Sequence, residues 1–402
     1  MKILLITQYY APVKGAGAKR TGKMAQYLTK AGHDVSVLTG FPSYPTGKLD
    51  SKYNFKLWTH ERIDSIEVTR VWELPTSTQD GTVKRLLNML SFAKFAAFYA
   101  LFHRSYDAVI VSSPSFLSGV AGLWASKKKT RFFFDIRDLW PDSMIDMGVV
   151  GADSAVARWA QKLERKFYDR SNKIFAATPG IKKHLISEKI DENKIQVLLN
   201  SVDTDLFKPQ PTDLERFDFQ AGDFICGYVG NISRAYDMET VLKSAEILKK
   251  EPHIKFWIIG EGENKTKLMN IAKEKSLDNV VFKAETSLAD LPPIVNAFSV
   301  GLAPIANIGV SQESFPSKTC EYFACAKPVL ASLGGDMRKI IEGREVGLIY
   351  EFGNAQALAK AILNLYHDKT LTQEMGVEAH NLAVEMFSDK AFAEKLVSSI
   401  EK

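Results

Sequence analysis

A short segment around residue 318 holds the side chains whose types and spacing best suit chemistry. Glu313 and Glu321 stand eight positions apart, and Lys318 lies between them. Ser317 is a favoured N-cap residue and Pro328 stops a helix, so the sequence predicts a helix of about nine residues with Lys318 at its first position. Two carboxylates and a cation around one helix start form a pattern that suits a charged, polar ligand.

Lys318 occupies a position that local electrostatics disfavour. A cation at the positive end of the helix macrodipole is unfavourable, and Asp or Glu is preferred there. We therefore expect an anion to compensate. The backbone N–H groups at the helix start, together with the ammonium group, would bind a diphosphate, as helix amino termini commonly do.

The two glutamates are placed to hold a nucleotide and a sugar. Glu321 lies three residues after Lys318 on the same helix face, at a rise of about 4.5 Å. That separation suits a phosphate on the lysine and a ribose diol that donates two hydrogen bonds to the carboxylate. Glu313, in the preceding loop, is placed to contact hydroxyl groups of a transferred sugar. The alternative is that both glutamates are ordinary surface charges.

The same segment resembles the E-x7-E signature of retaining family-4 glycosyltransferases of the GT-B fold, especially those with a Pro-Ser-Lys-x-x-Glu-Tyr core. The other matching pieces follow in order over nearly the whole chain: Tyr9-Tyr10-Ala11-Pro12 with Gly15 and Gly17, Gly32-His33-Asp34-Val35, Phe41-Pro42-Ser43-Tyr44-Pro45-Thr46-Gly47, Arg137-Asp138-Leu139-Trp140-Pro141-Asp142-Ser143, and Asn200-Ser201-Val202-Asp203. Together they are similar to bacterial N-acetyl-L-fucosaminyl transferases of O-antigen or capsule biosynthesis.

This resemblance implies two Rossmann-like domains that face a cleft. It also implies retaining transfer of a sugar such as N-acetyl-L-fucosamine from a UDP-sugar to a polyprenyl-diphosphate-linked saccharide, without a metal or another cofactor. In the family the second glutamate holds the ribose, the first contacts the sugar, and the lysine holds phosphate. The implied catalytic residues are Glu313, Lys318 and Arg234; the donor-binding residues are Glu321, Gly15, Gly17, Phe315, Pro316, Ser317 and Asn231; and the acceptor-binding residues are Arg137, Asp138 and Arg20.

The chain departs from the family pattern at two places. The loop 230–236 offers only Arg234, where many relatives place an Arg and a Lys on the diphosphate. Arg137-Asp138 stands where many relatives have His-Asp, so a general-base histidine is not carried over. The expected course is departure of the diphosphate, whose own oxygen helps to deprotonate the acceptor on the same face of the sugar. Double displacement through Glu313 as nucleophile is the alternative.

Alternation of strands and helices predicts two α/β domains in tandem. The first half opens with a βαβ unit, in which a helix at about 18–31 separates strands 2–7 and 34–39, and further strands are expected at 108–112, 131–136, 173–177 and 196–199. The second half repeats the alternation from 224 onward. The proline-containing stretch 205–211 is the predicted linker. We expect an acceptor-binding domain at 1–205, a nucleotide-sugar-binding domain at 206–385, and a final helix within 386–402 that docks on either.

Several motifs argue against other cofactors. Gly15-x-Gly17-x-x-Arg20 does not complete a dinucleotide fingerprint, and the second strand ends without an acid, so nicotinamide binding is not predicted. This loop either gives donor phosphates and acceptor access to its amides, with Arg20 nearby, or is a tight turn. Asp203-Thr204-Asp205 resembles a metal motif but lies in the linker. The three cysteines have no ligand or disulfide spacing, which fits a reducing cytoplasm.

Charge is unevenly distributed along the chain. Residues 1–205 carry 30 Lys and Arg against 20 Asp and Glu, and the remainder carries 22 against 27. The segment 84–104 is very apolar with basic ends, so it is either a helix buried against the sheet or one that lies in a membrane interface. With Lys127, Lys128 and Lys129, it suggests peripheral contact with the inner face of the cytoplasmic membrane. No pattern for nucleic acid occurs.

Two other functions fit the sequence less well. A nucleotide-sugar 2-epimerase also uses two Rossmann-like domains. A non-catalytic module that binds anionic lipid would use the basic first half, but it gives no reason for Lys318 at a helix start with Glu321 one turn further on.

Overall fold

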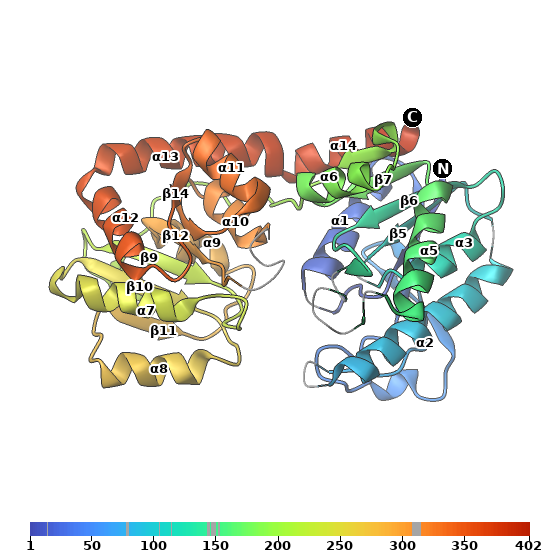
Figure 1. The fold of residues 1–402 in the computed structure, drawn as a ribbon, viewed down its shortest axis with the longest axis horizontal. Helices are drawn as coiled ribbons and strands as arrows, with labels where there is room; N and C mark the ends of the chain where they lie inside the picture. Colours follow the sequence, from blue (N-terminus) through green and yellow to red (C-terminus); the bar gives the residue numbers. More distant parts are fainter. Residues whose placement is uncertain are drawn as a thin grey trace. The chain divides into compact units, whose positions relative to one another are not determined.

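The chain forms two α/β units in the computed structural model, which describes residues 1–402 except 14, 78–79, 104, 114, 143–144, 146–149, 152 and 308–314. The first unit comprises Met1–Asn200 and Phe392–Lys402, and the second comprises Ser201–Ala391 (Figure 1). Each unit has a sheet of mainly parallel strands covered by helices, which confirms the predicted fold class of two Rossmann-like domains.

The first unit is built on an eight-stranded sheet of order β3-β4-β2-β1-β5-β6-β7-β8. Among the strand pairs that the structure describes in this sheet, β3/β4 alone is antiparallel. The strands are β1 (Lys2–Thr7), β2 (Asp34–Gly40), β3 (Trp58–Ile63), β4 (Ile66–Val71), β5 (Ala108–Ser112), β6 (Arg131–Ile136), β7 (Lys173–Ala176) and β8 (Ile195–Val197), and the helices are α1 (Ala16–Lys30), α2 (Thr82–Phe102), α3 (Ser118–Ala125), α5 (Ala155–Arg170), α6 (Pro179–Ser187) and the carboxyl-terminal α14 (Asp389–Glu401).

Alternate residues of the central strands supply two cores, one on each face of this sheet. Ile3 and Leu5 of β1 pack with α1 and α14. Leu4 and Ile6 pack on the opposite face with α2 and α3. Successive side chains of a strand point to opposite faces, so a strand that is apolar throughout requires helices on both sides.

Helix α14 returns the chain to the first unit (Figure 1), where it packs on the face of the sheet that bears α1. Phe392, Leu396 and Ile400 are buried in the core that also contains α1 residues. The Arg131 guanidinium donates a hydrogen bond of 2.5 Å to the Ile400 carbonyl oxygen. The sequence leaves the docking of this helix open between the two domains, and the structure places it on the first.

The second unit contains a six-stranded parallel sheet of order β11-β10-β9-β12-β13-β14, the 3-2-1-4-5-6 order of dinucleotide-binding folds. Its strands are β9 (Phe224–Val229), β10 (Ile254–Ile259), β11 (Val280–Lys283), β12 (Val300–Pro304), β13 (Val329–Ser332) and β14 (Gly347–Ile349), and its helices are α7 (Met238–Ile247), α8 (Lys265–Glu274), α9 (Leu291–Ala297), α10 (Ser317–Ala324), α11 (Gly335–Gly343), α12 (Ala355–His367) and α13 (Lys369–Leu382).

Each sheet has one point at which the strand order reverses. It lies between β1 and β5 in the first unit and between β9 and β12 in the second. Ligands of open α/β sheets bind beyond the carboxyl ends of the strands at such points, because the loops there diverge to opposite faces. The loops after these four strands are therefore the places to examine.

Candidate active site

Lys318 lies at the reversal point of the second sheet, near the carboxyl end of β9. Its side chain is 8% exposed, and its Nζ lies 3.8 Å from the ring centroid of Tyr228 and 3.7 Å from that of Tyr236. The Nζ atom has no hydrogen-bond partner among the described residues. Burial holds the pKa of Lys318 well below its ordinary value, and the nearby Glu321 carboxylate opposes that shift. A buried ammonium group without a hydrogen-bonded anion is an incomplete site.

The residues at the carboxyl end of β9 leave room for the Lys318 side chain. Gly230 has a φ of 140°, and a Cβ atom there would lie 2.9 Å from Lys318 Nζ. Tyr228 is fixed by a hydrogen bond of 2.6 Å from its hydroxyl to the Asn231 carbonyl oxygen. The hydroxyl of Tyr322, from α10, accepts a hydrogen bond of 2.9 Å from Val229 N–H and ties the helix to the strand. The two tyrosines that enclose the ammonium group were not recognised from the sequence.

Helix α10 begins one residue earlier than the sequence predicts. Its first residue is Ser317 and its N-cap is Pro316, without a capping hydrogen bond from a side chain, so the predicted Ser317 cap is wrong. Thr319 turns inward instead, and its hydroxyl donates to the Pro316 carbonyl oxygen at 2.6 Å. The first turn contains no acidic residue. Phe315 packs on Phe387, with ring centroids 5.5 Å apart. Glu313 lies outside the described residues.

Arg234, predicted as a second cation for the diphosphate, is held differently from Lys318. Its side chain is 83% exposed, and its Nε lies 3.4 Å from Glu263 Oε1. Asn231 is also exposed. The described part of this site therefore contains one buried cation, Lys318, and one solvated cation that already has a carboxylate neighbour.

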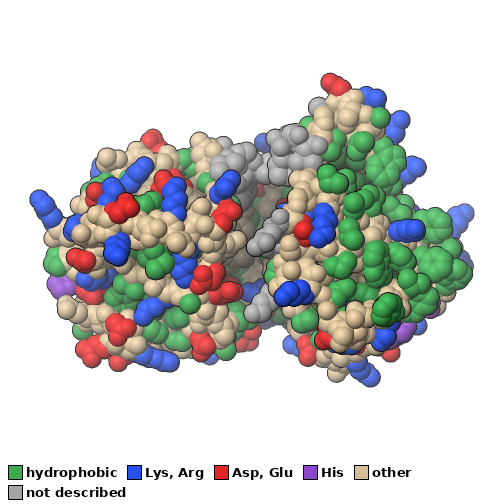
Figure 2. Space-filling model, turned by 90° about the horizontal axis from the view of Figure 1, so that it is seen from below, with side chains coloured by type: hydrophobic (Ala, Val, Ile, Leu, Met, Phe, Trp, Pro, Cys, Tyr) green, Lys and Arg blue, Asp and Glu red, His purple; other side chains and the backbone are tan. Residues whose placement is uncertain are grey.

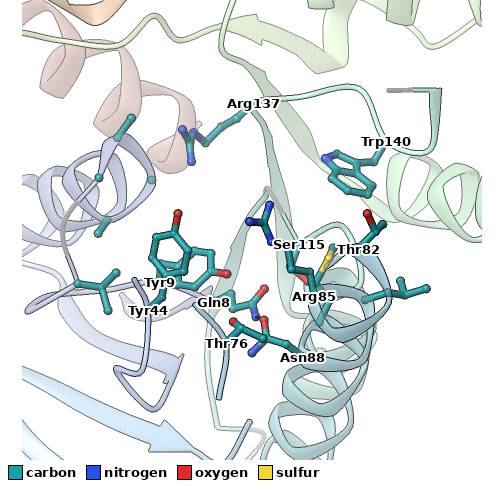
Figure 3. A pocket seen from close by; sticks show the side chains of 17 residues that line it. Gln8, Tyr9, Tyr44, Thr76, Thr82, Arg85, Asn88, Ser115, Arg137 and Trp140 are labelled. Carbon is teal, nitrogen blue, oxygen red and sulfur yellow. Dashed lines mark hydrogen bonds between the residues drawn. The ribbon is translucent and has the colours of Figure 1, made fainter. Parts of the chain in front are cut away.

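A pocket of about 510 Å³ occupies the reversal point of the first sheet. Its walls are formed by the loop after β1, the first turns of α1 and α2, and the segments after β5 and β6 (Figure 3). The lining residues with aromatic, basic or polar side chains are Tyr9, Tyr44 and Trp140; Arg85 and Arg137; and Gln8, Thr76, Thr82, Asn88 and Ser115. Tyr9 and Tyr44 form one wall, with ring centroids 5.4 Å apart. Such a mixture of aromatic faces and polar groups suits a sugar ring.

A buried carboxyl group supports the floor of this pocket. Glu73 is 1% exposed, and Gln8 Nε2 donates hydrogen bonds of 3.0 Å to Glu73 Oε2 and 2.6 Å to Asn88 Oδ1. Burial raises the pKa of Glu73 to about 8, although hydrogen bonds from Gln8 and Asn88 and the charge of Arg70 lower it. The side-chain N–H groups of Gln8 are thus both occupied. The other polar atom of this side chain, the amide oxygen Oε1, is the one that can accept a hydrogen bond at the pocket.

The structure separates the three residues predicted to bind an acceptor. Arg137 lines the pocket, and its Nη1 would lie 2.6 Å from a Cβ atom at Gly17. Glycine at that position therefore lets the guanidinium lie against the start of α1. Gly15 and Gly17 also line the pocket, but Asp138 is exposed and is not part of the lining.

The assignment of Arg20 to the acceptor is wrong. This side chain is 3% exposed and forms an ion pair of 2.7 Å with Asp135, which is fully buried. Its other N–H groups donate to the carbonyl oxygens of Leu198 and Leu199. Arg20 therefore joins α1, β6 and the segment after β8, and its burial with paired charge gives it a structural role.

The Asp203-Thr204-Asp205 sequence forms a turn. The Asp203 carboxylate accepts hydrogen bonds of 3.0 Å from the backbone N–H groups of Asp205 and Leu206. Elsewhere in the part of the chain that the structure describes, no three His, Cys, Asp or Glu side chains gather closely enough to hold a metal ion.

Comparison with known proteins assigns a family description to each unit. Residues 15–201 match the model described as "Glycosyl transferase 4-like domain", and residues 210–382 match the model described as "Glycosyl transferases group 1". The putative colanic acid biosynthesis glycosyl transferase WcaI of Escherichia coli K12 is 27% identical over 346 residues, which cover 81% of each chain. The D-inositol 3-phosphate glycosyltransferase of Pseudarthrobacter chlorophenolicus is 25% identical over 296 residues, covering 68% of this chain and 66% of the relative.

Solved structures share the fold over the full length of the chain. Sucrose-phosphate synthase from Thermosynechococcus elongatus aligns with a TM-score of 0.74 and 18% identity, covering 100% of this chain and 98% of that one. Anabaena HepE in complex with UDP aligns with a TM-score of 0.71 and 15% identity, covering 100% of both chains. At these identities the likeness shows the fold.

Proposed function

We propose a donor, an acceptor and a chemical course for this glycosyltransferase, whose two units match the models of the glycosyl transferase 4-like domain and of glycosyl transferases group 1. The donor is a UDP-sugar, and it binds with its diphosphate at Lys318. The observation that carries this proposal is the buried, unpartnered Lys318 ammonium group at the start of α10. Structural neighbours that hold UDP support the choice of nucleotide.

The remaining donor contacts follow from the same placement. Glu321, one turn into α10, would hold the ribose diol, and Glu313 would contact the sugar. The segment 315–317 and Asn231 would contribute backbone groups near the phosphates. The transferred sugar is an N-acetylated amino sugar such as N-acetyl-L-fucosamine, a choice that rests on the motif resemblance described above.

Transfer proceeds with retention of configuration and requires no metal ion. The bond between the anomeric carbon and the diphosphate oxygen breaks, and a bond to the acceptor oxygen forms on the same face. The acceptor proton passes to the departing diphosphate. Lys318, Arg234 and the first N–H groups of α10 stabilise the negative charge that develops, because preorganised donors act most strongly in a water-poor site.

The acceptor is a polyprenyl-diphosphate-linked saccharide of cell-surface polysaccharide assembly, such as that of O-antigen or capsule. It binds in the pocket of the first unit, where Arg137 lies. The WcaI relative, named for colanic acid biosynthesis, supports this class of acceptor. A lipid-linked acceptor would bring the enzyme to the inner face of the cytoplasmic membrane.

An apolar patch on the first unit is suited to that contact. We define the apolar patch as the exposed side chains Leu87, Phe98 and Phe102 of α2, Trp124 of α3 and Trp159 of α5. Figure 2 shows hydrophobic side chains spread over the face of the first unit that bears α2. The opposite side of α2, with Phe92 and Ala96, is buried on the sheet, so the two interpretations of segment 84–104 apply to opposite sides of one helix. Among the described residues no helix is long and apolar enough to cross a bilayer.

A panel of nucleoside diphosphates tests the donor directly. We expect UDP to raise the melting temperature more than ADP, GDP or CDP, because ligand that binds only the native state stabilises it by mass action. UDP-sugars that pass this test are then incubated with a saccharide acceptor, and the anomeric configuration of the product is read by NMR. Stabilisation by none of the nucleotides, or an inverted product, would contradict the proposal.

A further inference from the structure

Two buried amide side chains, Gln8 and Asn88, lie side by side in the lining of the first-unit pocket (Figure 3). They are 2% and 1% exposed, and they come from the end of β1 and from α2. The carboxyl group of Glu73, from the segment after β4, lies beneath them. An amide side chain ends in one donor and one acceptor of similar shape, so its partners decide which of the two can meet a ligand.

A backbone carbonyl group fixes the orientation of both amides. Asn88 Nδ2 donates a hydrogen bond of 2.8 Å to the Leu74 carbonyl oxygen, so Asn88 Oδ1 is the atom that faces Gln8. Gln8 Nε2 donates to that oxygen at 2.6 Å and to Glu73 Oε2 at 3.0 Å. A reversed Gln8 amide would bring its oxygen against Asn88 Oδ1, and two acceptor oxygens in contact repel one another. The direction of the Gln8 amide therefore follows from a main-chain group that cannot be reversed.

Gln8 Oε1 has no hydrogen-bond partner among the described residues. The main-chain oxygen of Gln8 is already used, since it accepts from Gly40 N–H at 3.2 Å and from the Thr39 hydroxyl at 3.1 Å. Glu73 holds Gln8 in both of its protonation states, because a protonated carboxyl group keeps an acceptor oxygen. A buried acceptor without a partner is unfavourable, so a ligand that donates to Gln8 Oε1 gains affinity.

We infer that Gln8 is a specificity-determining residue of this pocket, and that its Oε1 accepts a hydrogen bond from one hydroxyl group of the acceptor sugar. Asn88 and Glu73 are the positioning residues that present this oxygen. A sugar that is deoxygenated, O-methylated or carries a carboxylate at that position cannot donate there, and a site built around such a hydrogen bond rejects it. The inference rests on the proposed function in one respect, namely that the ligand of the pocket is the acceptor.

Sugar analogues test the inference by NMR titration of the full chain. The methyl glycosides of glucose, galactose, mannose and N-acetylglucosamine are compared first, and the one that binds most tightly is replaced by its monodeoxy and monodeoxyfluoro analogues. We expect one position at which both replacements weaken binding about 10–100-fold, because neither group can donate to the buried oxygen. Absence of binding by all four glycosides, or a series without such a position, would overturn the inference.

A double-mutant cycle assigns that hydroxyl group to Gln8. In Gln8→Met, which removes the acceptor at similar size, the glycoside and its deoxy analogue should bind equally. Gln196→Met, on β8 outside the pocket lining, is the matched control and should keep the full preference. A preference that persists in Gln8→Met would contradict the assignment. In the parent protein, the side-chain carbonyl carbon resonance of Gln8 should shift with the glycoside and not with its deoxy analogue, which tests the contact without a substitution.

Two substitutions of Glu73 test its positioning role. Glu73→Gln keeps an acceptor oxygen for Gln8 Nε2 and should retain the preference for the hydroxyl group, whereas Glu73→Met removes that oxygen and should reduce the preference severalfold. A merely structural role would change the affinities of the glycoside and of its deoxy analogue alike. An unchanged preference in Glu73→Met would show that Glu73 does not position Gln8.

UDP separates this inference from the proposed function, because Gln8 belongs to the first unit and Lys318 to the second. If the hydroxyl preference is intact and UDP does not bind, the proposed donor is wrong and the role of Gln8 stands. If sugar is transferred from the UDP-sugar with the same kcat/KM for the acceptor in Gln8→Met as in the parent, the proposed function stands and the inference falls. Displacement of the glycoside by UDP would assign the pocket to the donor and would also overturn the inference.

Discussion

At the scale of single residues, Lys318 and Arg137 share one property. Lys318 in the second unit and Arg137 in the first both lie near a sheet reversal point, and neither side chain has a hydrogen-bond partner among the residues described. Arg20, by contrast, is fully paired with Asp135. Since an unpaired buried charge is unfavourable, the cations without partners are the ones that ligands are expected to complete.

Replacement of Lys318 should remove chemistry and leave the fold. We expect Lys318→Ala to lower the rate of sugar transfer by about 10²–10³-fold, because it removes a donor aimed at the leaving diphosphate. Its melting temperature should not fall, since the variant also removes a buried, unpaired charge. Lys243→Ala, an exposed lysine of α7, is the control. Transfer rates that match in the two variants would exclude Lys318 from catalysis.

Binding of UDP should also change the protonation of Lys318. Burial lowers its pKa in the free protein, and a diphosphate within hydrogen-bonding distance would raise it. At a pH between the two pKa values, the protein therefore takes up a proton on binding, and affinity falls as the pH rises through the pKa of the complex. Calorimetry in two buffers of different ionisation enthalpy measures the uptake. Lys318→Met should show none, and equal uptake in that variant would assign the proton elsewhere.

The burial of Glu73 beneath the first-unit pocket can be tested through the pH dependence of stability. Its pKa is about 8 in the folded protein, against 4.5 for an ordinary glutamate. Between these values the native state holds a proton that the unfolded state has lost, so its contribution to stability falls as the pH rises. In the Glu73→Gln variant, the free energy of unfolding should no longer fall over this pH range, as measured by urea unfolding of the first unit. Glu67→Gln, an exposed carboxylate on β4, should keep it.

Local spacing and long-range contacts differ in what the sequence can predict. Lys318 stands in a local motif at the start of a helix, and a cation at that position predicts an anionic ligand. Arg20 was misassigned because its partner, Asp135, is 115 positions away and no spacing reveals it. Arg85 and Asn88 were missed because they occur within a predominantly apolar helix. Tyr9, Tyr44 and Trp140 do stand in the quoted motifs, but only the fold brings them to one pocket.

At the scale of elements, apolar strands and glycine-bounded loops were predictable. The final helix was placed correctly along the chain, at Asp389–Glu401. The β3/β4 hairpin was not predicted, since β3, Trp58–Ile63, alternates between exposed and half-buried residues and lacks an apolar run. The residue type of Ser317 predicts a cap, but Pro316 occupies the cap position and Ser317 is the first residue of α10.

The docking of α14 on the first unit can be tested by its buried face. Leu396 is fully buried against the core of that unit, and we expect Leu396→Ala to reduce the free energy of unfolding by about 2–5 kcal/mol. Lys395→Ala alters the adjacent exposed position and should have little effect. Denaturant unfolding, followed by hydrogen exchange in each unit, shows where the loss occurs. Destabilisation confined to the second unit would contradict the observed packing.

At the scale of the whole molecule, charge and apolar surface divide between the two halves of the chain. The basic half, 1–205, also carries the apolar patch, whereas 206–402 is acidic. An interfacial helix needs apolar side chains to enter the lipid and basic side chains to attract anionic headgroups. Lys84 and Lys94 on α2 are both exposed and provide the second requirement.

Sedimentation with vesicles tests whether this surface binds a membrane. We expect the protein to sediment with anionic vesicles at low salt, and less with neutral vesicles or at high salt, because screening weakens attraction between exposed charges. Phe98→Ser with Phe102→Ser should reduce the bound fraction severalfold, since both side chains are at least half exposed and would lose their transfer into lipid. Met269→Ser with Val377→Ser removes comparable exposed apolar groups from the second unit and should leave binding unchanged. If both double variants bind as the parent does, basic side chains alone account for the attraction and the apolar patch does not enter the bilayer.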